Sequence, residues 1–158
     1  PLHQVTMPTR RQTLQHSAAV AALLAASGLL PQDAQAAFNS AAFSALTVAD
    51  ALRALGASAP QASPDVSLVG PDVADNGAAV SISLSTTLPN AQQLLILVDK
   101  NVSPLAARFH LTDSVEPNFA LRIKMSESSD VYAVAITTDG RAWFAKRRIK
   151  VILGACNG

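Results

Sequence analysis

The hydrophobic pattern of the chain changes its period once, near residue 66. Five apolar residues before that point recur every three or four positions: Phe43, Leu46, Ala49, Leu52 and Leu55. This spacing places side chains on one face of a helix. Thr47 with Asp50 three residues later is typical of a helix N-terminus, and Gly56 is typical of a helix end. The pattern therefore predicts a helix over residues 37–56, followed by a linker over residues 57–64.

From residue 66 onward, apolar and polar residues alternate in short segments. The stretches 80–84 and 119–125 alternate cleanly, and 94–98 is a continuous apolar run that suits a strand buried on both faces. Residues 131–137 and 142–153 are the remaining strand candidates. Five turn-forming sequences separate these segments: Asp75-Asn76-Gly77, Leu88-Pro89-Asn90, Ser103-Pro104, Glu116-Pro117-Asn118 and Asp139-Gly140.

The turns and short strands together predict the fold class. Strands at regular intervals with no helical run between them indicate an antiparallel β-sandwich rather than alternating strands and helices. We therefore expect an all-β domain over residues 65–153, preceded by the short N-terminal helix and followed by a tail over residues 154–158.

The first 36 residues have the order of a secretory signal peptide. Arg10 and Arg11 precede an uncharged run over residues 17–30, and Ala34-Gln35-Ala36 supplies small residues at the cleavage positions. The paired arginines resemble a twin-arginine signal. The uncharged run is shorter than the ~20 residues that span a bilayer, so no membrane anchor is expected. We expect translation to start at Met7, cleavage after Ala36, and a mature chain in a bacterial periplasm.

Composition excludes several kinds of chemistry. Lys and Arg number 12 against 11 Asp and Glu, a net charge of +1, so no overall field attracts nucleic acid. A single cysteine excludes an internal disulfide and a multi-thiolate zinc site, and no glycine-rich phosphate loop is present. After signal removal His110 is the only histidine. No metal site and no cofactor is predicted.

The candidate chemistry lies in the tail, at the only cysteine, Cys156. Its neighbours are small residues: Gly154, Ala155, Asn157 and Gly158. We expect this tail to be mobile and to present a thiol beyond a rigid scaffold. An inter-chain disulfide is the alternative for an unpaired cysteine in an exported protein.

Four cations precede the tail, in Lys146-Arg147-Arg148 and at Lys150. On a strand, alternation places Lys146, Arg148 and Lys150 on one face and Arg147 on the other. Solvated lysines that protect an edge strand from aggregation are one interpretation of this patch. The other is electrostatic steering of an anionic cargo or of an acidic partner.

Five segments of the chain follow one another in the order found in a known family. They are Asp75-Asn76-Gly77, then Leu97-Val98-Asp99-Lys100-Asn101 with Pro104-Leu105-Ala106, Arg122-Ile123-Lys124-Met125, Asp139-Gly140 and Gly154-Ala155-Cys156-Asn157-Gly158. Together they resemble the SoxY family of the bacterial sulfur-oxidising (Sox) system, whose tail is typically Gly-Gly-Cys-Gly-Gly. The chain departs from that tail at Ala155 and Asn157.

The resemblance implies a covalent carrier rather than an enzyme. In the family, an immunoglobulin-like SoxY pairs with SoxZ, and thiosulfate-derived sulfur is attached to the tail cysteine, here Cys156. The implied partners are a SoxZ-like subunit and SoxAX-, SoxB- and SoxCD-like enzymes that load, hydrolyse and oxidise the cargo. Two alternatives stay open: an exported immunoglobulin-like interaction module with an inter-chain disulfide, and a similar carrier that serves another periplasmic oxidoreductase.

Overall fold

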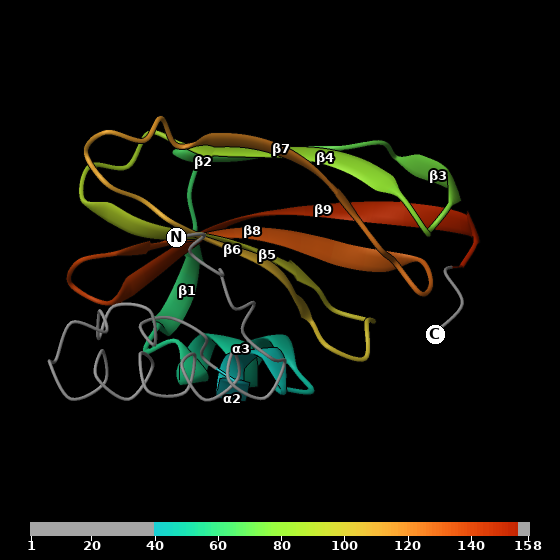
Figure 1. The fold of residues 1–158 in the computed structure, drawn as a ribbon, viewed down its shortest axis with the longest axis horizontal. Helices are drawn as coiled ribbons and strands as arrows, with labels where there is room; N and C mark the ends of the chain where they lie inside the picture. The colour runs from blue at the N-terminus through green and yellow to red at the C-terminus, as the bar shows by residue number, and fades with distance from the viewer. Residues whose placement is uncertain (1–39, 155–158) are drawn as a thin grey trace, which may run out of the picture. The chain divides into compact units, whose positions relative to one another are not determined.

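The computed structural model describes residues 40–154 of the chain. Two short helices, α2 (Ser40–Phe43) and α3 (Val48–Ala54), come first, and nine strands follow them in the described residues (Figure 1). In chain order the strands are β1 (Ser58–Ala62), β2 (Val66–Val69), β3 (Val73–Asn76), β4 (Val80–Thr86), β5 (Ala91–Val98), β6 (Leu105–His110), β7 (Asn118–Ile123), β8 (Ser129–Thr137) and β9 (Arg141–Leu153).

The strands form two sheets that pack face to face. The larger sheet has the order β1-β9-β8-β5-β6, with β3 also paired to β9, and the smaller sheet has the order β2-β4-β7. Figure 1 shows the smaller sheet above the larger one, with α2 and α3 below it. The predicted all-β sandwich with a short helical region at its start is confirmed, and the arrangement is consistent with an immunoglobulin-like domain.

Strand β5 lies at the centre of this architecture because both of its faces are covered. Leu94, Ile96 and Val98 belong to the core between the two sheets, whereas Leu95 and Leu97 belong to a second core under the helices. All five side chains are fully buried. The continuous apolar run at 94–98 therefore corresponds to a strand buried on both sides, as predicted.

The helical region differs from the single predicted helix. Its described part is interrupted between α2 and α3, and Leu46, which lies in the interruption, is 76% exposed. Thr47 causes the break because its backbone is extended and its hydroxyl accepts a hydrogen bond from the Asp50 N–H at 3.1 Å, which starts a new helix. After α3, Gly56 adopts a left-handed conformation with φ 73°. Residues 37–39 lie outside the described residues.

The edges of the larger sheet differ from a purely antiparallel arrangement. Residues 57–64 were predicted as a linker, but they contain β1, which pairs in parallel with the start of β9. Strand β3 pairs in parallel with the end of β9. The sequence of β1 includes Pro60, which has no N–H to donate and is tolerated only at a sheet edge.

The turn between β8 and β9 is held by the carboxylate of Asp139. This carboxylate accepts hydrogen bonds from the Thr137 hydroxyl, from the Arg141 N–H at 3.3 Å and from the Arg141 guanidinium at 2.8 Å. Gly140, with φ 81°, supplies the left-handed residue of the turn. The bond from Thr137 and then those from Arg141 lower the pKa of Asp139 to about 2.

We predict that Asp139→Asn destabilises the domain at neutral pH and not at pH 2. The folded state lowers the pKa of Asp139 from its ordinary value of 3.8, so the stabilisation is present above that value and is lost as the pH falls through about 2. Thermal unfolding at several pH values measures this effect, with Asp113→Asn in an exposed loop as the control. An equal loss of melting temperature at pH 6 and pH 2 would contradict the prediction.

Candidate functional site

The candidate site lies where β9 ends and the tail begins. Leu153 is the last residue of β9 and Gly154 is the last described residue. Ala155, Cys156, Asn157 and Gly158 lie outside the described residues. The structure instead defines the tail root, which consists of Leu153, Gly154 and the residues that contact them.

A turn between β3 and β4 holds the end of β9. The Gly77 N–H donates to the Leu153 carbonyl at 2.7 Å, and the Gly77 carbonyl accepts from the Met125 N–H at 2.8 Å. The Asn76 side chain stabilises the turn by accepting from the Ala78 N–H at 2.8 Å. The buried residue Gly77 therefore links the end of β9 to the segment that follows β7.

Gly154 lies against the backbone of Ser126. A Cβ added at position 154 would come within 2.1 Å of the Ser126 carbonyl oxygen. This is far closer than a carbon and an oxygen can approach, so only glycine fits here while residue 126 keeps its place. We expected Gly154 to make the tail flexible, and its close approach to Ser126 adds a steric requirement.

Asn101 holds the same segment through its side-chain amide. Its Nδ2 donates to the Lys124 carbonyl at 2.8 Å, and its Oδ1 accepts from the Ser126 N–H at 3.1 Å. Met125, which lies between these two residues, is fully buried in the core between the sheets. Both polar ends of the amide are thus used to hold one short stretch of backbone beside the tail root.

Ser128 adds a further connection to β9. Its Oγ accepts from the Val151 N–H at 2.9 Å and donates to the Val151 carbonyl at 3.3 Å. The connection between β7 and β8 is therefore bonded to β9 just before the tail begins.

Three of the segments quoted for the family resemblance meet at the tail root. They are 75–77, 97–101 and 122–125, and they contribute Gly77, Asn101 and the backbone of Lys124 and Met125. Sequence reasoning assigned none of these residues a role. Only the order of the family segments in the sequence pointed to these residues, because Asn-Gly and Lys-Asn are equally compatible with ordinary turns.

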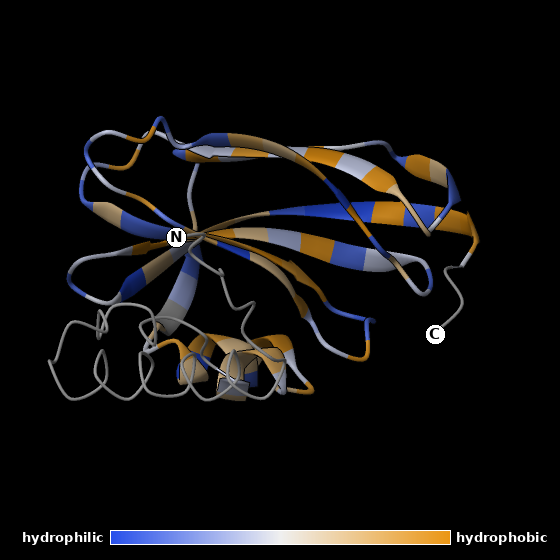
Figure 2. Cartoon of the chain, viewed as in Figure 1, coloured by the Kyte–Doolittle hydropathy of each residue, from blue (hydrophilic) through white to orange (hydrophobic). Residues whose placement is uncertain are grey.

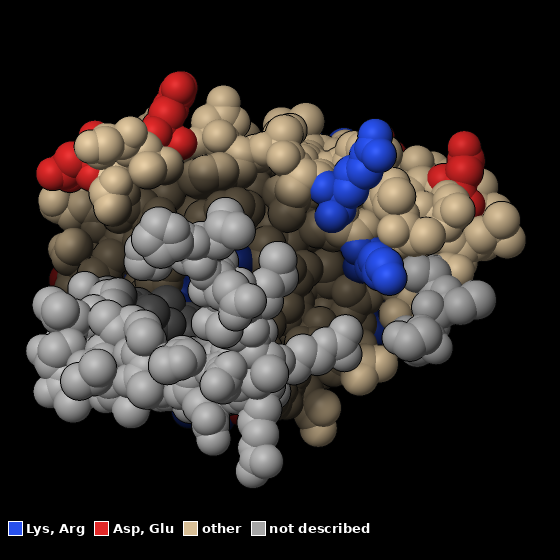
Figure 3. Space-filling view, in the orientation of Figure 1, with Lys and Arg blue, Asp and Glu red and all other residues tan. Residues whose placement is uncertain are grey.

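The predicted cation patch lies on the face of β9 that points toward the helix side of the larger sheet. Phe144, two residues before Lys146 on that face, packs in the core under the helices, whereas Ile149 lies in the core between the sheets. Asp130 pairs with Lys146 at 3.6 Å and with Arg148 at 3.4 Å, and Lys150 has no ion pair among the described residues. Figure 2 shows the hydrophilic stretch along β9, and in Figure 3 Lys and Arg side chains lie over the region where β7 crosses in front of β9.

Arg147 lies on the opposite face of β9 from this patch. Its guanidinium pairs with Asp72, which precedes β3, at 2.7 Å. The alternation predicted for the four cations therefore matches the strand geometry. Arg147 is engaged with the β3 side of the sandwich and does not contribute to the cation patch.

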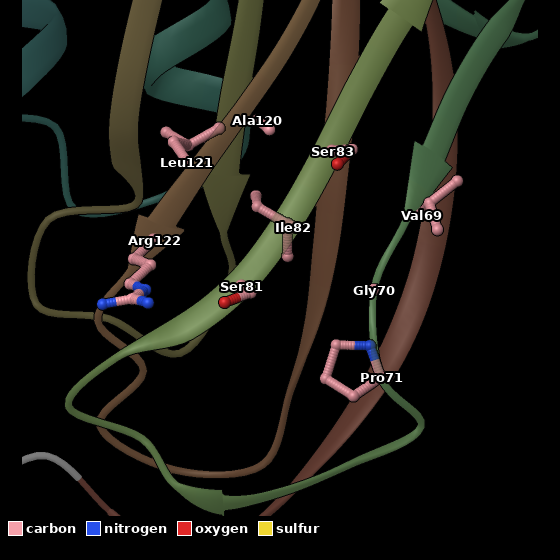
Figure 4. A pocket seen from close by; sticks show the side chains of 9 residues that line it. All are labelled: Val69, Gly70, Pro71, Ser81, Ile82, Ser83, Ala120, Leu121 and Arg122. Atoms are coloured by element: carbon pink, nitrogen blue, oxygen red, sulfur yellow. The ribbon is translucent and has the colours of Figure 1, made fainter.

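None of three hollows on the described surface is lined by the tail root. Figure 4 shows a depression of about 400 Å³ on the smaller sheet, where Ser81 and Ser83 of β4 and Arg122 of β7 are the polar lining residues. An apolar groove of about 610 Å³ lies beside α3 and is lined in part by Tyr132 and Phe144. No described cysteine or histidine lines these two hollows or the third one, which lies beside the turn between β8 and β9.

The remaining titratable groups form no metal site in residues 40–154. No three His, Cys, Asp or Glu side chains of this part are placed to hold a metal ion. His110 is exposed at the end of β6, and partial burial followed by the nearby charge of Arg108 lowers its pKa. Among the described helices, none has the length and hydrophobicity needed to cross a membrane.

Comparison with known proteins places these features in context. Residues 51–156 match the model of the family described as sulfur oxidation protein SoxY. The structure of the sulfur carrier protein SoxY from Chlorobium limicola f thiosulfatophilum is 29% identical, covers 66% of this chain and 96% of its own, and superposes with a TM-score of 0.60. No curated protein sequence matches the chain.

Other solved structures are less similar. A superoxide reductase (neelaredoxin) from Ignicoccus hospitalis is 18% identical over 54% of this chain and 79% of its own, with a TM-score of 0.48. A putative superoxide reductase from Thermotoga maritima is 15% identical over 58% of this chain and 86% of its own, with a TM-score of 0.45.

Proposed function

The chain belongs to the SoxY family, and from this premise we propose that it is a periplasmic carrier that holds thiosulfate-derived sulfur on Cys156. One observation carries the proposal: the family match runs through the sandwich and on to residue 156, so it includes the cysteine. The likeness to the sulfur carrier from Chlorobium limicola supports the same carrier role in sulfur oxidation. The family also implies a complex with a SoxZ-like subunit.

The proposed loading step is an oxidative coupling at the thiol. The Cys156 thiol and thiosulfate form an S–S bond to give a cysteine S-thiosulfonate, and the step releases one proton and two electrons. A haem enzyme of the SoxAX type is the proposed electron acceptor. Water then cleaves the terminal sulfonate as sulfate on a SoxB-like enzyme and leaves a persulfide on Cys156. Where a SoxCD-like enzyme is present, it oxidises the remaining sulfur.

The chemistry of a tail thiol suits this role. An unperturbed cysteine has a pKa of about 8.5, so only a small fraction is thiolate at neutral pH. The thiol therefore reacts slowly until a partner activates it. A short tether of small residues keeps the cargo at high effective concentration near a docked enzyme. The domain supplies the rigid support, because β9 is paired with β8 up to Ile149 and with β3 from Lys150 to Leu153.

The cation patch has a proposed part in this cycle. Lys146, Arg148 and Lys150 lie on the strand that leads to the tail, so their charge favours the anionic thiosulfonate or an acidic docking surface. Asp130 offsets part of this charge through its two ion pairs, and Lys150 is the patch member nearest the tail.

Intact-mass spectrometry tests the proposed function. The mature chain, isolated with its partner from cells grown on thiosulfate, is expected to begin at Ala37 and to carry adducts of single sulfur atoms and of thiosulfonate on Cys156. A thiol reductant should release all of them. If the only reducible species is a stable disulfide-linked dimer, the interaction-module alternative is correct instead.

A further inference from the structure

The hydrogen bonds at the tail root form a connected series that begins at Asn101. The Asn101 amide holds the backbone of Lys124 and Ser126, and Met125 between them donates its N–H to the Gly77 carbonyl. Gly77 in turn donates its N–H to the Leu153 carbonyl. The position of the end of β9 therefore depends on Asn101 through backbone groups that lie far from it in the sequence.

The contact of Gly154 with Ser126 depends on the same residue. A Cβ at position 154 would overlap the Ser126 carbonyl. The backbone at residue 126 therefore limits where the chain can run after β9. Asn101 accepts the N–H of that same residue at 3.1 Å and so holds the Met125–Ser126 peptide, which directly precedes the carbonyl that Gly154 faces. Loss of the amide removes this support without removing any atom of the tail.

Asn101 is itself held by the most buried strands of the domain. Its turn follows β5, and the Asp99 N–H donates to the Asp130 carbonyl at 3.1 Å. The Lys100 N–H donates to Oγ of Ser129, which is fully buried at the start of β8, at 3.0 Å. The Asn101 N–H donates to the Val98 carbonyl at 3.3 Å. Because these bonds tie its turn to buried strands, the Asn101 side chain holds the tail root at a fixed position relative to the core.

We propose that Asn101 is a positioning residue for the carrier reaction, because it fixes the point and the direction in which the tail leaves the sandwich. This inference rests on the proposed function. The tether of Cys156 then starts from one fixed point relative to a docked partner enzyme, which raises the effective concentration of the thiol at that enzyme's site. The side-chain amide of asparagine suits this position because it offers a donor and an acceptor in one plane to bridge the Lys124 carbonyl and the Ser126 N–H.

The test compares Asn101→Ala with a matched control, Thr86→Val, in the chain bound to its partner. Thr86 also makes two side-chain bonds to backbone, donating to the Asp65 carbonyl at 3.0 Å and accepting from the Leu88 N–H at 3.2 Å. It lies at the other end of β4 from the tail root. The control therefore loses the same number and kind of bonds while the tail root keeps its own.

We expect the share of Cys156 that carries sulfur in thiosulfate-grown cells to fall at least about threefold in Asn101→Ala and to stay unchanged in Thr86→Val. Alkylation of Cys156 by iodoacetamide should proceed at the wild-type rate in both variants, because a small reagent needs no fixed orientation. Asn101→Asp, which keeps the acceptor for Ser126 and loses the donor for Lys124, should give an intermediate share.

A second measurement does not depend on the sulfur chemistry. Amide hydrogen exchange at Gly77 and Met125 should become about tenfold faster or more in Asn101→Ala and should not change in Thr86→Val. Gly154→Ala removes no hydrogen bond, but its added Cβ forces the chain away from Ser126. It should therefore lower the fraction of Cys156 that carries sulfur, as Asn101→Ala does.

Two results would overturn the inference. One is a wild-type sulfur share in Asn101→Ala, and the other is an equal loss in Thr86→Val, which would mean that general instability is the cause. If the wild-type protein itself carries no adduct, the proposed function fails. The exchange rates at Gly77 and Met125 then still decide whether Asn101 holds the tail root.

Discussion

Cys156→Ser is expected to abolish thiosulfate oxidation by cells that depend on this chain, while the domain stays folded. A serine hydroxyl forms no S–S bond with thiosulfate, so no cargo can be attached to it. The fold should survive because the two core clusters of the described residues, which lie within residues 42–151, hold the sandwich. Thiosulfate-dependent oxygen uptake measures the first effect, and the melting temperature of the purified variant measures the second.

The matched control for this variant is Asn157→Gly, next to the cysteine. It restores one of the glycines found in the typical tail of the family and leaves the thiol in place, so we expect at least wild-type oxygen uptake. Undiminished uptake by Cys156→Ser would refute the carrier function. Loss of uptake in both variants would mean that the tail is sensitive to any change and that the thiol has not been tested.

Ile96→Ala is expected to destabilise the domain by about 3 kcal/mol, within the range measured for large-to-small substitutions in cores. Ile96 lies in the central strand β5 and is fully buried between the two sheets, so its removal leaves a cavity that the neighbouring strands cannot close. The midpoint of urea unfolding measures the loss.

Ile152→Ala makes the same chemical change at a surface position. Ile152 is 60% exposed near the end of β9, and we expect its replacement to change stability by less than about 0.5 kcal/mol. Equal shifts of the urea midpoint in the two variants would show that β5 is not the centre of the core.

The strands that the sequence predicted well are those whose pattern reflects burial. Strands β4 and β8 alternate or run apolar because one or both of their faces are covered, and β5 was recognised by its continuous run. Strands β1 and β3 were not predicted. Each is four or five residues long and pairs with β9 at an edge, so its formation depends on a distant partner rather than on its own pattern.

The candidate site was only partly accessible from the sequence, for a similar reason. A single cysteine among small residues is visible in the composition, so Cys156 could be chosen directly. The tail root could not, because its bonds join residues more than twenty positions apart, such as Asn101 with Lys124 and Ser126. Asn101 was quoted only as part of a family segment, and Gly154 was interpreted as a source of flexibility rather than as a close contact.

If partner enzymes handle the tail, as the proposed function requires, the pairing of β9 has a mechanical consequence. A pull on the tail acts along this 13-residue strand. The strand is bonded along one side to β8 and along the other to β1 and β3. Ladder hydrogen bonds run across the strands, so such a force loads many of them in shear at once instead of opening them one by one. The domain is therefore expected to stay folded when a partner enzyme pulls on the tail.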